Sequence, residues 1–356
     1  MNKKTKKLLL LVLAVVLICC GSVFLKRENA FEIKGGASSL DLDTPKQTEI
    51  DQADNAAAQG PKSPLSGLAC ENAAARPIAV SLGGDKESRP LSGISQADLV
   101  IEMPVVTGSI TRYLAFFGCN KVAEIGSVRS ARHDFIPLAM GFDAIMAHWG
   151  GSHFALEKLN AGVMDNINAL YLEGSVFYRK LGTVAPHNGF TGYDRLAKYS
   201  GEKNYRLTTS FVGFKFAATE ESSGMKGRIT IGYPSSFKVE YEYDPIKNEY
   251  LRFKGGTREM DKNTSQQVVA KNVAVMFAAS RQIEGQYNDM DIEGEGKAIV
   301  YRNGEEIKGK WSKDKSSLSS KLYFYDEAGK EVEFVPGQTW IQVVQTDQSV
   351  DWTTGF

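Results

Sequence analysis

Residues that could carry chemistry gather in one stretch of the sequence, Glu124 to Phe154 (EIGSVRSARHDFIPLAMGFDAIMAHWGGSHF). The stretch holds guanidinium, imidazole and hydroxyl groups, and all four histidines of the chain lie between His133 and His187. Guanidinium and imidazole groups together suit either the binding of an anion or acid–base catalysis. We therefore expect a functional site in this part of the chain.

The segment Gly126 to Arg132 (GSVRSAR) predicts an anion site. If a helix begins near Ser130, this serine is its N-cap, and the free backbone N–H groups of the first turn point outward. Arg129 and Arg132 beside such a terminus suit a phosphate or a carboxylate, which guanidinium binds bidentately. Ser130 is also a candidate nucleophile. In the structural alternative Ser130 only caps the helix, and the arginines pair with carboxylates such as Asp98, Glu102, Glu124 or Asp134.

His148 follows a predicted buried strand and precedes a Gly-Gly turn, in the sequence HWGGSH. Ligands of α/β sheets bind at the carboxyl ends of strands, and glycine lets the backbone approach a ligand closely. His148 is thus a candidate catalytic residue, and Ser152 a candidate ligand-binding residue. In the alternative interpretation His148 is structural, and Ser152 caps the helix that follows.

Another imidazole lies in the loop Ala185-Pro-His-Asn. Proline stiffens this backbone, and the amide of Asn188 could orient His187 or donate to an oxyanion. Arg179 is a further candidate ligand-binding residue, as is Asp165, which could orient a histidine or form an Asx-turn. The alternative role for His187 is a loop fastener that hydrogen-bonds a carbonyl group.

The spacing of these residues predicts neither a metal ion nor a cofactor. A turn separates His148 from His153, so they do not share a helical face, and no HExxH or CxxC motif occurs. Only a metal site assembled from distant loops stays open. A Ser–His nucleophile pair formed with Ser130 or Ser152 is chemically feasible, but no GxSxG elbow supports it.

The N-terminus predicts attachment to a membrane. A basic flank (KKTKK, residues 3–7) precedes an apolar run from Leu8 to Leu25, which suits a signal peptide or one membrane-spanning helix. No A-x-A-like cleavage site sits well after the run, and Cys20 follows Cys19 rather than the small residue of a lipoprotein signal. We favour an uncleaved single-pass anchor over a lipoprotein, with the N-terminus in the cytoplasm and the rest of the chain outside.

Cysteine usage and charge agree with an exported protein. Cys70 and Cys119 are the two cysteines beyond the apolar run, and outside the cytoplasm we expect them to form a disulfide rather than stay as buried thiols. Lys+Arg and Asp+Glu each number 42. This balance argues against a nucleic-acid partner bound through bulk charge.

The chain divides into four parts: a cytoplasmic tail and anchor (1–27), a flexible linker (28–63), an α/β or α+β domain (64–222) and a mainly β domain (223–356). In the first domain the pattern predicts strands at 76–82, 98–106, 111–118 and 143–148, and helices at 131–142, 153–160 and 193–199. Pro104 places its strand at an edge or on a bulge. In the second domain, short β-branched or aromatic runs alternate with turns, and we expect Trp311 and Trp340 in the core.

Several motifs occurring in order resemble the YerB-like family of bacterial envelope proteins. They include PLSGL, RPIAV, RPLSGISQADLVIEMPV, SITRYLAFF, EIGSVRSAR, DAIMAHWGGS and APHN, followed by VAKNVAVMF, GEGKAIVYRNGEEIKGKWSK and PGQTWIQVV. The resemblance covers the chain from about Pro64 to Val344. It implies a two-domain extracytoplasmic protein held at the membrane, often as a lipoprotein, and it implies no reaction.

Three functional hypotheses follow. In the first, Arg129, Arg132 and Arg179 bind an anionic or polar envelope ligand, such as a cell-wall glycopolymer or peptide. In the second, the protein is a hydrolase or transferase on envelope material, with His148 or His187 as general base. In the third, it is a structural module that binds a partner.

Overall fold

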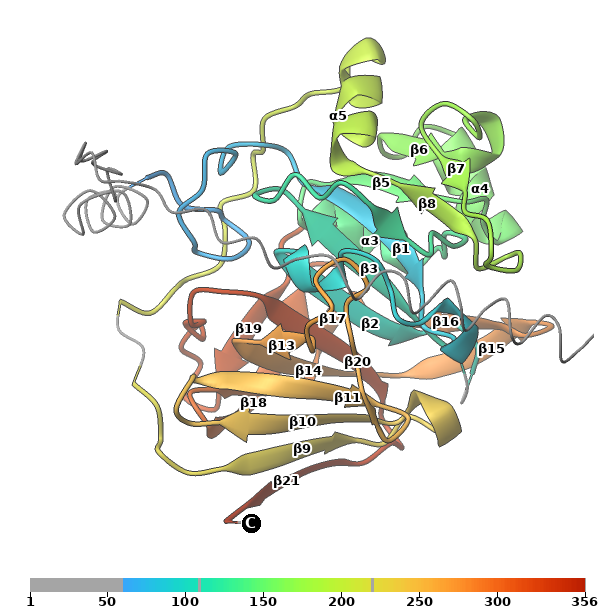
Figure 1. The fold of residues 1–356 in the computed structure, drawn as a ribbon. Coiled ribbons are helices and arrows are strands. Elements are labelled where there is room, and N and C mark those ends of the chain that lie inside the picture. Colours follow the sequence, from blue (N-terminus) through green and yellow to red (C-terminus); the bar gives the residue numbers. More distant parts are fainter. Residues whose placement is uncertain (1–59, 108–109, 219–220, 356) are drawn as a thin grey trace, which may run out of the picture. The chain divides into compact units, whose positions relative to one another are not determined.

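The computed structural model describes residues 60–107, 110–218 and 221–355 (Figure 1). The predicted anchor and most of the predicted linker lie outside these residues. The last linker residues differ from the prediction, because Ser63 is buried and its hydroxyl accepts hydrogen bonds from the backbone of Leu65 and Ser66. Across the described ranges, no helix has the length and apolar character needed to cross a membrane.

A ten-stranded mixed sheet runs through the described chain (Figure 1). From one edge to the other its strands are β19 (Tyr323–Asp326), β18 (Glu305–Lys313), β17 (Gly294–Arg302), β14 (Asn272–Ala278), β20 (Thr339–Gln345), β2 (Leu99–Pro104), β3 (Thr111–Phe117), β1 (Ile78–Gly83), β5 (Ile145–His148) and β6 (Asn166–Asn168). The central contact is between β2 and β20, which pair in parallel. The N-terminal and C-terminal regions therefore share one sheet.

Smaller elements surround this sheet. A six-stranded sheet contains β9 (Gly227–Ile231), β10 (Val239–Asp244), β11 (Glu249–Lys254), β12 (Thr257–Arg258), β13 (Val269–Ala270) and β21 (Val350–Thr354). A hairpin pairs β15 (Ser280–Glu284) with β16 (Tyr287–Met290), and a three-stranded sheet joins β4 (Ile125–Gly126), β8 (Gly189–Thr191) and β7 (Tyr178–Arg179). The α-helices of the described ranges are α3 (Phe135–Gly141), α4 (His153–Asn160) and α5 (Tyr193–Glu202).

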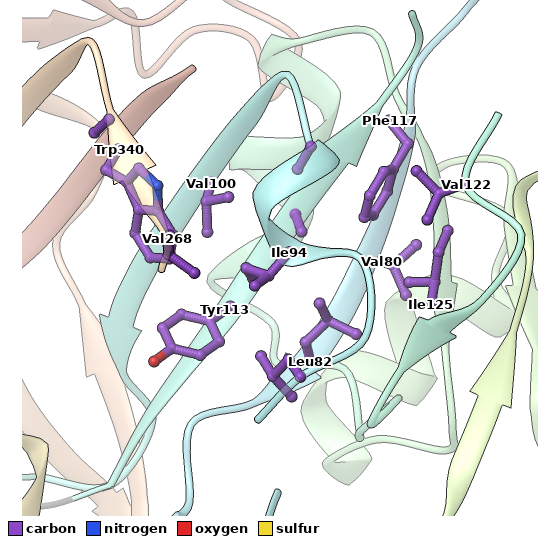
Figure 2. Close-up of a cluster of buried hydrophobic side chains, with 14 of the residues drawn as sticks. Val80, Leu82, Ile94, Val100, Tyr113, Phe117, Val122, Ile125, Val268 and Trp340 are labelled. Atoms are coloured by element: carbon purple, nitrogen blue, oxygen red, sulfur yellow. The ribbon is translucent and has the colours of Figure 1, made fainter. Parts of the chain in front are cut away.

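Alternating side chains of the large sheet build two hydrophobic cores, one on each face. One core joins Val80 of β1, Tyr113 of β3 and Trp340 of β20 to residues of the six-stranded sheet and α5 (Figure 2). The other core joins the intervening residues, such as Ala79 and Leu114, to α3 and α4. The large sheet is thus covered on both faces, which accounts for the complete burial of β1, β2, β3, β5 and β20.

A buried ionic network lies where the large sheet meets the six-stranded sheet. Glu102 of β2 contacts Arg252 and Lys254 of β11, and all three side chains are fully buried. Arg252 also pairs with Glu259 at 2.6 Å. The guanidinium carbon of Arg252 lies 4.0 Å from the centre of the Trp340 ring. The network places two cations against two carboxylates, so its charges balance.

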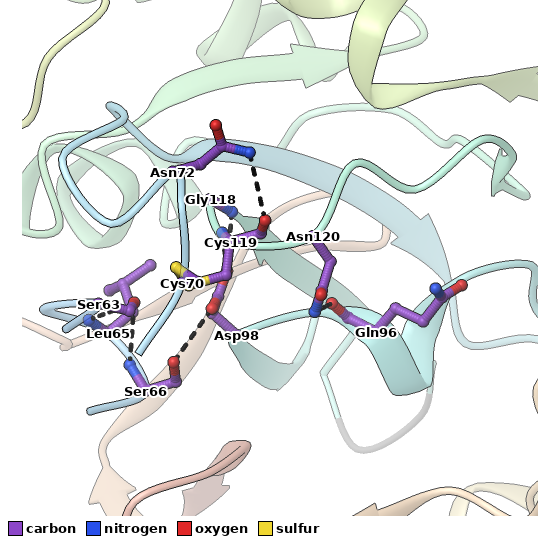
Figure 3. Close-up of a disulfide and its surroundings, with 10 residues drawn as sticks. All are labelled: Ser63, Leu65, Ser66, Cys70, Asn72, Gln96, Asp98, Gly118, Cys119 and Asn120. Carbon is purple, nitrogen blue, oxygen red and sulfur yellow. Dashed lines mark hydrogen bonds between the residues drawn. A yellow bond between two sulfur atoms is a disulfide. The ribbon is translucent and has the colours of Figure 1, made fainter. Parts of the chain in front are cut away.

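The predicted disulfide between Cys70 and Cys119 is confirmed (Figure 3). It ties the loop before β1 to the end of β3. Asp98 holds the same corner together, because its carboxylate accepts hydrogen bonds from the backbone N–H groups of Gly118 (2.7 Å) and Cys119 (3.0 Å). Ser66 donates a third hydrogen bond to Asp98 at 3.2 Å.

The predicted strands of the first domain are confirmed in place and order, and so are helices α4 and α5. The mainly β character of the C-terminal region and the burial of Trp311 and Trp340 are confirmed as well. The N-terminal region, however, is not rich in α/β structure: its central strands β1, β3 and β2 pair antiparallel.

Two local predictions are wrong. The helix expected from Ala131 begins only at Phe135, because Ala131 instead pairs with Gly150 and Ser152 through its backbone. The strand containing Pro104 is central rather than at an edge or bulged. Proline is tolerated there because β2 pairs with β20 only as far as Glu102, so no partner needs an N–H group at Pro104.

Candidate functional site

The candidate site lies where the parallel strands β1, β5 and β6 end. Residues 127–132, here called the crossing segment, run along this edge and are held on both sides. The N–H of Gly83 donates to the carbonyl of Ser127 (3.0 Å), and the N–H of Ala131 donates to the carbonyl of Gly150 (2.9 Å). These bonds fix the crossing segment between the end of β1 and the turn after β5, where strand ends of this kind commonly bind ligands.

Arg129 of the crossing segment joins two loops. Its guanidinium pairs with Asp85 at 2.8 Å and lies 2.9 Å from Nδ1 of His187. The hydroxyl of Ser88 lies 3.0 Å from the same nitrogen. Because arginine can only donate, Nδ1 of His187 accepts, and the proton of the neutral ring is on Nε2. Gly83 permits this close approach, since a Cβ atom there would lie 2.3 Å from the hydroxyl of Ser88.

Two further guanidinium groups lie beside Arg129. Arg112 is the second residue of β3 and donates to the carbonyl of Ser130 at 2.9 Å, and Arg132 lies over the ring of Tyr287, 5.4 Å from its centre. Arg112 is 7% exposed and Arg132 6%. Burial, together with the positive charges of Arg132 and Arg129, lowers the pKa of Arg112 to about 9. We call Arg112, Arg129 and Arg132 the guanidinium cluster.

The guanidinium cluster is short of negative charge. Among the described residues, the one carboxylate that forms an ion pair with it is Asp85, on Arg129. The Nε atoms of Arg112 and Arg132 are buried without a hydrogen-bond partner. The hydroxyl of Ser127, the first residue of the crossing segment, is also buried without a partner. Buried donors normally have partners, so the arrangement is suited to receive an anion.

His148 is placed differently from the cluster. It is fully buried, with Nδ1 2.7 Å from the carbonyl of Gly150 and Nε2 3.1 Å from the amide oxygen of Asn166. Burial lowers the pKa of His148. Both ring nitrogens contact oxygen atoms of the protein, one in the turn after β5 and one on β6, so the arrangement matches the structural alternative. Ser152 matches its structural alternative too, because its buried hydroxyl caps α4 by accepting from the N–H of Ala155 at 3.2 Å.

Ser130 is not the N-cap of a helix, contrary to expectation, because α3 begins at Phe135 with Asp134 at the N-cap. The carbonyl of Ser130 instead accepts hydrogen bonds from Arg112 and from the hydroxyl of Ser81 (3.1 Å). Ser130 therefore contributes its backbone to the site.

Arg179, at the end of β7, and Asn188, next to His187 in the chain, form a hydrogen-bonded pair. Arg179 donates to the amide oxygen of Asn188 and to Glu173, both at 2.8 Å, and stacks on Trp149 with 4.3 Å between its guanidinium carbon and the ring centre. Its charge is thus already paired. The carboxylate of Asp165 pairs with Arg76.

A second polar cluster lies next to Arg132. Nε2 of His133 is 3.2 Å from a carboxylate oxygen of Asp134 and 3.2 Å from one of Asp289. His133 and Asp134 precede α3, whereas Asp289 comes from β16. Burial lowers the pKa of His133 and raises the pKa of Asp134 well above its usual range, and the nearby charge of Asp289 raises the latter further. Imidazole and carboxylate groups are common metal ligands.

Sequence reasoning missed Arg112, Asp85, Ser88 and Asp289. Arg112 lies inside the apolar strand sequence TRYLAFF, where a single arginine looks like an exposed strand residue. Asp289 belongs to the C-terminal region, and only the fold of the hairpin β15–β16 brings it to His133. The usable signal was the pair Gly83-Gly84 directly before Asp85, which marks a close backbone approach.

Comparison with known proteins places the chain in a family. Residues 65–206 match the family described as "Protein of unknown function (DUF3048) N-terminal domain", and residues 229–341 match its C-terminal domain. The chain is 33% identical over 290 residues to a Bacillus subtilis (strain 168) protein named "Putative lipoprotein YerB", covering 80% of this chain and 86% of that protein.

A solved structure agrees with this relationship. The crystal structure of the YerB protein from Bacillus subtilis superimposes with a TM-score of 0.73 at 33% sequence identity, covering 82% of this chain and 99% of that chain. The two family domains and the shared fold agree with the resemblance that the sequence motifs indicated. The chain therefore belongs to the YerB-like family, whose members consist of the N-terminal and C-terminal domains of DUF3048.

Proposed function

We propose that the protein is a membrane-associated, extracytoplasmic envelope protein that binds an anionic cell-wall ligand, a glycopolymer or peptide, at the guanidinium cluster. The name of the Bacillus subtilis relative, that of a lipoprotein, supports the location. The disulfide Cys70–Cys119 supports it as well, because disulfides persist in oxidising compartments.

One observation carries the proposed ligand class: the three guanidinium groups of the cluster lie next to one another, and only one carboxylate of the described residues, Asp85, forms an ion pair with them. Two of the groups, Arg112 and Arg132, are almost fully buried, and each keeps one N–H donor without a partner. The positive charges of the buried guanidinium groups repel one another. An anion that bridges these groups reduces the repulsion and also accepts hydrogen bonds from the unpartnered N–H donors. A phosphate or carboxylate group has the charge and the acceptor geometry for this role.

The remaining predicted residues take secondary parts in the proposal. His187 contacts Arg129 from the side of the loops, and the hydrogen bond between Arg179 and Asn188 stiffens the loop that carries His187. The same geometry gives little support to catalysis by His187, since Arg129 already occupies the Nδ1 lone pair that a general base needs.

Attachment to the membrane by residues 1–27, through an uncleaved single-pass anchor, remains part of the proposal. Mass analysis of the mature N-terminus tests it. An intact Met1 supports the anchor, whereas a chain that begins at a lipidated Cys20 replaces the anchor by a lipoprotein signal.

The binding proposal is tested by calorimetric titration of the full-length protein with inorganic phosphate and with a glycerol phosphate oligomer. Substitutions Arg112→Gln and Arg132→Gln each remove a charged donor, so we expect about tenfold weaker binding or more. Arg195→Gln is the matched control: this arginine of α5 is exposed and donates to the carbonyl of Ser175. Binding that is equally strong in all three variants would contradict the proposed site.

A further inference from the structure

The cluster of His133, Asp134 and Asp289 has the composition of a metal site. One imidazole nitrogen and two carboxylate oxygens, one from each residue, lie within 4.8 Å of one another. Nε2 of His133 faces both carboxylates at 3.2 Å. A neutral imidazole has a single N–H group, so His133 can donate to only one of the two carboxyl groups that its Nε2 faces.

The surroundings of this cluster also favour a bound cation. Asp134 is 4% exposed and Asp289 is half-buried, so neither carboxylate is freely screened by water. One oxygen of Asp289 receives a hydrogen bond from Arg281 at 2.7 Å, which leaves its other oxygen to face His133. Two carboxylates held this closely need a proton or a cation between them.

A cavity of about 360 Å³ opens onto these side chains. Its lining includes His133, Asp134 and Asp289, and further carboxylates at Asp291 and Glu293. Two polar atoms of the lining are buried without a partner, Nδ1 of His133 and Oε1 of Glu293. His133 is 8% exposed, so its unpartnered nitrogen is not accounted for by bulk solvent.

We propose that His133, Asp134 and Asp289 bind a divalent transition-metal ion, through Nε2 and one carboxylate oxygen of each aspartate. A mixed set of one imidazole and two carboxylates suits Mn²⁺, Fe²⁺ or Zn²⁺ better than Ca²⁺, which takes six or more oxygen ligands. Three protein ligands leave coordination positions open toward the cavity, where water or a ligand oxygen binds. Lys158 and Arg281 on the rim limit the total negative charge of the site.

This site draws its ligands from both regions of the chain. His133 and Asp134 precede α3, and Asp289 is carried by the hairpin β15–β16. The ion therefore fastens the hairpin over the edge where the guanidinium cluster lies, with Tyr287 of the same hairpin against Arg132. The proposal does not depend on the anion site, because it rests on different side chains.

The test is a titration of chelator-treated full-length protein with Mn²⁺, followed by electron paramagnetic resonance, and with Zn²⁺, followed by calorimetry. We expect one ion per chain, and magnetic coupling of bound Mn²⁺ to an imidazole nitrogen. His133→Gln is expected to abolish that coupling. Asp289→Asn is expected to weaken Mn²⁺ binding by at least about tenfold, because the loss of a residue that only orients a metal ligand already weakens metal binding by about this factor.

Glu284→Gln supplies the matched control, because Glu284 is a carboxylate of the same hairpin that contacts another imidazole, His153, at 3.1 Å. It should bind Mn²⁺ as the unmodified chain does. Thermal unfolding with chelator present checks that Asp289→Asn, a change at a half-buried position, still folds. The proposal is overturned if the folded protein binds no stoichiometric ion, if Asp289→Asn binds as tightly as Glu284→Gln, or if bound Mn²⁺ shows no nitrogen coupling.

Discussion

Glu102 is the residue at which a single substitution should affect stability most. It is fully buried and faces the cations of Arg252 and Lys254, with a further hydrogen bond from Thr111 at 2.6 Å. Glu102→Gln leaves two buried cations with one remaining carboxylate, Glu259. Since an unpaired buried charge is costly, we expect the free energy of unfolding to fall by about 3 to 5 kcal/mol near pH 7. Urea unfolding followed by circular dichroism measures this loss.

The same substitution should remove part of the pH dependence of stability. Burial by itself raises the pKa of Glu102, but Lys254 and Arg252 outweigh burial and hold the pKa below its usual 4.5. A lowered pKa in the folded state stabilises the protein above pH 4.5, and that contribution is lost as the pH falls through the folded pKa. The difference between Glu102→Gln and the unmodified chain should therefore shrink in acid. The exposed carboxylate of Glu295, paired with Lys310, is the control: Glu295→Gln should leave stability unchanged at every pH.

Residue types predicted the site only where charge stood out from its neighbours. Arg129 and Arg132 are recognisable because they stand among small and apolar residues, and they do lie together. His148 has the same local appearance as a catalytic histidine, yet its burial between Gly150 and Asn166 depends on strand β6 and cannot be read from adjacent residues. Arg112 needed the fold, because only the pairing of β1 with β3 brings it to the crossing segment.

Among the elements, the disulfide-linked corner gives the clearest prediction. Cys70 and Cys119 are separated by 49 positions in sequence. In the chain-entropy model, closing a loop of this length stabilises the folded state by about 4 kcal/mol. The double substitution of both cysteines by serine should lower the unfolding free energy by roughly that amount, as measured by urea unfolding. If reduction of the disulfide leaves the midpoint unchanged, the unfolded chain is already compact and the entropic account fails.

Strands were easier to predict than helix ends, for a physical reason. Strands β1, β2 and β3 of the large sheet are buried on both faces and read as apolar runs, whatever their partners. The start of α3 depends instead on a competition: the backbone of Ala131 bonds to Gly150 and Ser152, which lie beyond β5. The prediction from Pro104 failed for a similar reason. Proline is excluded from a central strand only where a neighbouring strand needs its N–H group, and the pairing of β2 with β20 ends at Glu102.

At the scale of the whole molecule, the sequence pattern suggested two domains, and the family comparison also distinguishes an N-terminal and a C-terminal domain. Hydrophobic periodicity identifies strands but not their neighbours, so it gave no sign that β2 and β20 pair. Residues of the C-terminal region also contact residues of both proposed sites: Asp289 lies against His133, and Tyr287 lies against Arg132. Strands from both sides of residue 222, where the boundary is predicted, therefore belong to one sheet.

A shared sheet predicts shared unfolding. If residues 223–356 are removed, β2 loses the hydrogen bonds of β20, and both cores lose the side chains that β14 and β20 contribute. An exposed central strand with an open core is not stable in water. We therefore expect the complete chain to unfold in one cooperative transition, with tryptophan fluorescence and far-ultraviolet circular dichroism giving the same midpoint. A fragment of residues 60–222 should show no cooperative transition, whereas two separate transitions, or a fragment that folds by itself, would show that the regions are energetically independent despite their common sheet.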